Sequence, residues 1–147
     1  MSAAVCVLPP STPGAASSPD APHPPGALDA VRPWHPPPAP VTRVDVRLAA
    51  RILALRPTLA QHACKQRGFG RFGDKIVGST LPHLVEHVAI DLLVEDGQGP
   101  VAGATTWLDR ERGTMTVRLS CKTTPAEVTY AALNRAVTLV NGLLEPI

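Results

Sequence analysis

Residues 80–97 read TLPHLVEHVAIDLLVEDG, and this pattern predicts a helix that is buried on most of its sides. Thr80 is a suitable N-cap, because its hydroxyl can accept from a free N–H of the first turn. Pro82 falls within that first turn, where its missing N–H is not needed. Gly97 can adopt the left-handed conformation that ends a helix. The remaining residues are mostly aliphatic, so nearly the whole circumference is apolar.

Three titratable side chains interrupt this apolar surface. On a helical wheel, His83, Glu86 and His87 share one face with Ile90 and Val94, away from the broad core side. Burying imidazole and carboxylate groups without partners is unfavourable. The cluster therefore predicts either a metal site or a hydrogen-bonded structural group.

The spacing His83-x-x-Glu86-His87 is the inverted zincin pattern, H-x-x-E-H. Two histidines one helical turn apart can bind one Zn²⁺ through neutral nitrogens, and Glu86 would be the catalytic base that takes a proton from the zinc-activated water. A third protein ligand is needed, and we predict Glu127, which lies in the first turn of a later helix. The downstream carboxylates from which it is chosen are Asp91, Glu95, Asp96, Asp109, Glu111, Glu127 and Glu145.

Each of these residues also has a structural interpretation. Glu127 follows Thr124 by three residues, so it can complete a capping box at the start of a helix. His83, Glu86 and His87 can form a hydrogen-bonded cluster that fixes helix packing. His62 is predicted to be a loop or packing residue rather than a fourth ligand.

The other elements indicate a small α+β domain over residues 43–147. Helical spacing of apolar residues predicts a helix over 44–55, and Pro125 after Thr124 predicts a helix over 125–144. Alternating side chains predict strands over 101–108 and 114–121, joined by a turn. We therefore expect helices packed on an antiparallel hairpin or small sheet.

Residues 1–42 are predicted to form a disordered proline-rich tail, because they hold twelve of the seventeen prolines and only one aromatic residue. Residues 43–75 carry eight Lys/Arg against two Asp, which indicates a basic patch for an acidic partner. The segment 67–75 lacks the aromatic pattern of an RNA-recognition strand, so nucleic acid is not expected. Three widely spaced cysteines, the lack of a signal-peptide pattern and the lack of an apolar membrane span favour the cytoplasm.

Three stretches together, LRPTLAQHAC (55–64), RGFGRFGD (67–74) and GSTLPHLVEHVAIDLL (78–93), resemble the N-terminal domain of cyanophycin synthetase. AVTLVNGLL (136–144) is similar to the closing helix of that domain. The positions that match the family pattern in the three stretches are Pro57, Leu59, His62, Cys64, Gly68, Phe69, Thr80, Leu81, His83, Glu86, His87, Val88, Ala89 and Leu92. Residues 99–113 depart from the family pattern, so polymer binding is not carried over to that segment.

The resemblance implies a domain that holds a peptide polymer and, in some members, resembles an H-x-x-E-H metallopeptidase that trims it. The ATP-grasp and ligase domains of the synthetase do not fit in 147 residues, so synthesis is not predicted. We expect a stand-alone zinc-dependent peptide hydrolase acting on a cyanophycin-like or other peptide. One alternative is a non-catalytic module that binds an acidic or zwitterionic peptide or a protein partner. Another is an interaction protein that recruits a partner through its proline-rich tail.

Overall fold

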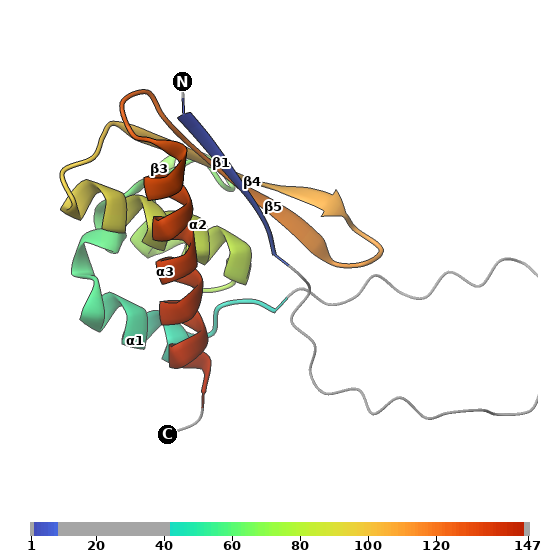
Figure 1. The fold of residues 1–147 in the computed structure, drawn as a ribbon. Helices are drawn as coiled ribbons and strands as arrows, with labels where there is room; N and C mark the ends of the chain where they lie inside the picture. Colours follow the sequence, from blue (N-terminus) through green and yellow to red (C-terminus); the bar gives the residue numbers. More distant parts are fainter. Residues whose placement is uncertain (1, 9–41, 146–147) are drawn as a thin grey trace, which may run out of the picture.

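Figure 1 shows the computed structural model, in which the helices lie on one side of a small antiparallel sheet. The structure describes residues 2–8 and 42–145. Along the chain the elements are β1 (Ser2–Leu8), α1 (Val46–Leu55), the 3-10 helix η1 (Pro57–Gln61), β2 (Ala63–Cys64), β3 (Gly70–Arg71), the 3-10 helix η2 (Phe72–Asp74), α2 (Leu81–Glu95), β4 (Val101–Asp109), β5 (Thr114–Cys121) and α3 (Ala126–Leu144). The predicted α+β class is confirmed.

The central helix α2 forms as its sequence predicts. The Thr80 hydroxyl accepts from the backbone N–H of His83 at 3.4 Å, and Pro82 occupies the first turn. Gly97 follows the helix with a φ of +79°, a conformation that favours glycine. Twelve of its fifteen residues are buried, which agrees with the nearly continuous apolar circumference. None of the helices in the described part of the chain is long and apolar enough to cross a membrane.

The predicted hairpin is present as β4 and β5, and a third strand extends it. The strand order is β1-β5-β4, with β5 in the centre and antiparallel to both neighbours. Along β5, Met115, Val117, Leu119 and Cys121 are buried and the residues between them are more exposed. The buried face lies under α2, while α3 packs against α2 and β1. The sheet therefore has one covered face, as the alternating pattern predicts.

The N-terminal segment differs from the prediction for residues 1–42. Ser2–Leu8 pair with β5 over seven residues, from Ser2 opposite Cys121 to Leu8 opposite Met115. This segment precedes the first proline and contains Val5 and Val7, so it can adopt extended structure and donate a full set of ladder hydrogen bonds. The rest of the predicted tail, 9–41, lies outside the described residues.

The core is mainly aliphatic and includes the fully buried Phe72. Leu48 and Ile52 of α1 are buried, but Leu55 is exposed. In α3, Val128 and Leu144 are exposed to 37% and 44%. The buried side chains of α3 are Thr129, Ala132, Leu133, Ala136 and Val140.

Candidate functional site

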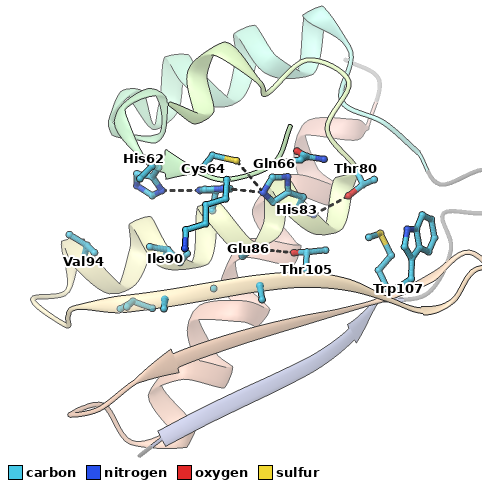
Figure 2. Close-up of a pocket in the computed structure, with 18 of the residues that line it drawn as sticks. His62, Cys64, Gln66, Thr80, His83, Glu86, Ile90, Val94, Thr105 and Trp107 are labelled. Atoms are coloured by element: carbon cyan, nitrogen blue, oxygen red, sulfur yellow. Dashed lines mark hydrogen bonds between the residues drawn. The ribbon is translucent and has the colours of Figure 1, made fainter. Parts of the chain in front are cut away.

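One face of α2 forms the floor of a cleft of about 960 Å³. The five residues that the helical wheel grouped together all line it: His83, Glu86, His87, Ile90 and Val94. The opposite walls are the segment 62–66 around β2 and the strand β4, as Figure 2 shows. The wheel therefore predicted correctly which side of α2 faces the cleft.

His83 and His87 lie side by side because they are four residues apart on α2. Their Nε2 atoms are 3.2 Å apart, and both rings are buried. The Phe72 ring stacks on His87 with a centroid distance of 3.9 Å and meets His83 edge-on. This packing restricts the orientation of both imidazoles before any ligand binds.

Cys64 of β2 joins the histidine pair from the other side of the cleft. Its sulfur lies 3.7 Å from Nε2 of His83, and one ligand atom from each of the three residues lies within 4.8 Å of the other two. No local pattern indicates this contact, because Cys64 stands nineteen residues before His83 and belongs to no C-x-x-C pair. The only signal was its position within the stretches that resemble the synthetase domain.

Two of the three distances between these atoms match the ligand separations of a tetrahedral zinc ion. Tetrahedral zinc, with bonds of about 2.05 Å to nitrogen and about 2.3 Å to sulfur, separates two nitrogen ligands by about 3.3 Å and nitrogen from sulfur by about 3.6 Å. The corresponding distances here are 3.2 Å between His83 and His87 and 3.7 Å between Cys64 and His83. A Cys/His/His set would leave the fourth position of a tetrahedral ion open, which is typical of catalytic zinc.

Both histidines favour the neutral form that a metal requires. Burial, together with the neighbouring His83 and His62 rings, lowers the pKa of His87 to about 3. Burial also lowers the pKa of His83, and the positive charges of Arg67 and Lys75 lower it further. Their nitrogen lone pairs are therefore available at neutral pH.

A hydrogen-bonded chain behind His87 orients its ring. Nδ1 of His87 lies 3.2 Å from Nδ1 of His62, and Nε2 of His62 lies 3.1 Å from Oδ1 of Asp91. Because a carboxylate only accepts, we assign the His62 proton to Nε2, so that Nδ1 of His62 accepts from Nδ1–H of His87. Nε2 of His87 then carries the lone pair that faces His83. A metal-binding histidine commonly donates its other ring N–H to an acceptor that fixes its orientation, and His62 is that acceptor for His87.

Asp91 is held as a carboxylate by several donors. Thr58 donates a hydrogen bond at 2.6 Å and Arg56 forms an ion pair at 2.6 Å. Burial by itself would raise the pKa of Asp91, but the hydrogen bonds from Thr58, Arg56 and His62 and the charge of Arg56 outweigh it, so the pKa lies below its usual value. His62 therefore belongs to this hydrogen-bonded chain and is not one of the three candidate ligands, which agrees with the prediction of a loop or packing residue rather than a fourth ligand.

Glu86 lines the same cleft but is directed toward β4. Its carboxylate accepts a hydrogen bond from the Thr105 hydroxyl, whereas His83 is directed toward Cys64, as the dashed lines in Figure 2 show. Gly103 makes room for it, because a Cβ at that position would lie 2.6 Å from Oε1 of Glu86. Burial raises the pKa of Glu86, and the Thr105 hydrogen bond lowers it by a smaller amount. The cleft thus contains a carboxyl group with an increased affinity for a proton.

The structure does not bring Glu127 to the histidines. Glu127 is exposed in the first turn of α3 and is not among the residues that line the cleft. The predicted capping box is also wrong: Pro125 is the N-cap, and the Thr124 hydroxyl donates to Gln98 instead. Of the described residues, Cys64 takes the place that we had predicted for Glu127.

A family model for the cyanophycin synthase-like N-terminal domain matches residues 41–145. This range includes every residue of the cleft and all of α1, α2, β4, β5 and α3. A comparison with curated proteins found no match.

Proposed function

The chain belongs to the family of cyanophycin synthase-like N-terminal domains, and we propose that it is a zinc-dependent peptide hydrolase. Cys64, His83 and His87 would hold the metal. The observation that carries the proposal is that one ligand atom from each of these three residues lies within 4.8 Å of the other two, in a cleft that also contains a buried glutamate. This revises the ligand set predicted from the sequence, in which Glu127 was the third ligand.

The side chains around the metal ligands have distinct roles in this proposal. Zinc supplies a Lewis acid that polarises a peptide carbonyl and acidifies water. Glu86 accepts the proton of the attacking water and returns it to the leaving amine, and its raised pKa brings it closer to the range where both transfers are favourable. Thr105 orients the Glu86 carboxylate, and the His62–Asp91 chain orients His87.

The substrate that we propose is a peptide, such as a cyanophycin-like polymer. Arg43 and Lys65 are among the residues that line the cleft, so their positive charges can attract carboxylates. A peptide with acidic side chains or a free C-terminus would be favoured by these charges.

A non-catalytic peptide-binding module is the second candidate function. It is favoured by the position of Glu86, whose carboxylate bonds to Thr105 on β4 while the histidines face Cys64. In that case the metal and the cationic side chains would retain a peptide without cleaving it.

Metal analysis of the full chain tests the proposal. We expect one zinc ion per chain in the wild type, loss of zinc in Cys64→Ala and His83→Ala, and retention in Cys121→Ala. Cys121 is a matched control because it is also a buried free cysteine but lies outside the cleft. Wild-type protein that purifies without metal and takes up no added zinc would contradict the proposal.

Glu86→Gln separates catalysis from binding. The variant keeps the size of the side chain and the three metal ligands, so zinc should remain while hydrolysis of a random-sequence peptide mixture falls at least a hundredfold. Zinc binding with no hydrolysis by the wild type, combined with retention of the same peptides, would support the binding module instead.

A further inference from the structure

The strand β4 is an edge strand that borders the cleft. Within the described residues it pairs only with β5, and the strand order β1-β5-β4 leaves its outer side without a partner strand. Figure 2 shows β4 as the strand next to the cleft, with β5 and β1 farther away. In an antiparallel ladder, alternate residues of an edge strand direct their N–H and C=O groups away from the sheet. Those groups of β4 are available for hydrogen bonds.

The cleft runs along this edge and also reaches Met115 on the covered face of β5. Successive side chains of a strand point to opposite faces, so a cleft over a single face would be lined by every second residue. Here five consecutive residues, from Val101 to Thr105, all line it. Thr105 also bonds to Glu86, which places the proposed base directly beside the strand.

The segment 101–105 of this edge carries none of the features that normally prevent strand pairing. Folded proteins protect exposed edges with lysine, proline, charged side chains or bulges. The segment 101–105 reads VAGAT, which contains no charge and no proline, and the register of β4 stays regular until the irregularity between Trp107 and Asp109. Its small side chains leave the backbone accessible over about 16 Å, at about 3.3 Å per residue.

We propose that an extended peptide binds as an additional strand along Val101–Thr105 of β4. This rests on the proposed function and specifies its substrate: a linear peptide of at least five residues, recognised mainly through its backbone amides. Main-chain hydrogen bonds supply the affinity in this binding mode, and pockets for alternate side chains supply selectivity. The bound strand lies over the face of α2 that carries Glu86, His83 and His87, between β4 on one side and Cys64 of β2 on the other.

Amide hydrogen exchange of the zinc-loaded Glu86→Gln chain tests this binding mode without turnover. With a random-sequence heptapeptide mixture in excess, alternate amides of Val101–Thr105 should exchange at least tenfold more slowly than without peptide. Protection confined to other parts of the cleft would overturn the proposal. Protection without peptide that grows with protein concentration, together with a dimer in sedimentation, would assign the edge to a second copy and would also overturn it.

Backbone methylation distinguishes this proposal from hydrolysis itself. Two sets of heptapeptides are compared, one N-methylated at the odd positions and one at the even positions, so that each set lacks the N–H donors along one side of an extended strand. One of the two sets should bind at least tenfold more weakly than the unmodified mixture. Equal affinity for the two methylated sets and the unmodified mixture would exclude strand addition, even if the wild type cleaves all three sets of peptides. Conversely, strand protection in a chain that cleaves none of them would retain this inference and reject the hydrolase.

Discussion

Gly103→Ala is expected to displace Glu86 from β4. A Cβ at this position would lie 2.6 Å from Oε1, 2.8 Å from Cγ and 2.9 Å from Cδ of Glu86. Ordinary contacts begin at about 3.4 Å, so the new methyl group would overlap three atoms by roughly 0.5–0.8 Å. The strand is fixed by its pairing with β5, where Gly103 faces Leu119, so the Glu86 side chain must move and its bond to Thr105 must break.

The magnitude follows from two opposing effects. Inserting a methylene into a packed site costs about 1–3 kcal/mol, whereas replacing glycine by alanine stabilises by about 0.4–1 kcal/mol through the unfolded chain. We expect the free energy of unfolding to fall by about 1–2 kcal/mol, measured by urea denaturation followed by circular dichroism. Zinc content should not change, since Gly103 is not in contact with the three ligands. Hydrolysis should fall at least tenfold at temperatures where the variant is fully folded.

A double-mutant cycle attributes this loss to Glu86. In a Glu86→Ala background the overlapping atoms are absent, so Gly103→Ala should cost nothing or should stabilise slightly. Gly142→Ala in α3 is the control, because nothing lies within 4 Å of the added Cβ, and it should raise the free energy of unfolding by about 0.5–1 kcal/mol. The reasoning is refuted if Gly103→Ala costs the same with and without the Glu86 side chain.

Three further changes test the electrostatics of the cleft. Because burial raises the pKa of Glu86, the folded chain loses stability as the pH rises above the usual value of 4.5 and this carboxyl ionises. Glu86→Gln should therefore increase the free energy of unfolding more at pH 7 than at pH 4. Equal increases at the two pH values, measured by urea denaturation, would contradict this. With chelator present, His87 is protonated only in the unfolded chain between about pH 6.5 and about pH 3, because its pKa is lowered in the folded chain. The free energy of unfolding should therefore decrease as the pH is lowered through this range, by up to about 1.4 kcal/mol per pH unit. The same slope in His87→Gln would exclude His87 as the cause. Arg56→Met should lower the free energy of unfolding by about 1.5–3 kcal/mol, because it leaves the buried Asp91 carboxylate with fewer hydrogen-bond donors. A loss below about 0.5 kcal/mol in urea denaturation would show that the remaining donors are enough to stabilise this carboxylate.

The sequence by itself determined the elements whose signals are local. Thr80, Gly97 and the continuous apolar run define α2, and the four-residue spacing of His83 and His87 is sufficient to place them together. Alternation of buried and exposed residues defined β5 in the same way. Such features depend on neighbours within one or two turns or along one strand, so they can be read without knowing the fold.

Tertiary structure alone decided how the site is completed. Cys64 contacts His83, which is nineteen residues away in the sequence, and Asp91 hydrogen-bonds to His62, which is twenty-nine residues away. The Glu86 side chain packs against Gly103, which belongs to a different element. The pairing of Ser2–Leu8 with β5 joins segments more than a hundred residues apart. No periodicity in the chain encodes these contacts, because they arise only when separate elements pack around one core. For the same physical reason Glu127, which has a suitable side chain at the start of a helix, remains exposed and away from the histidines.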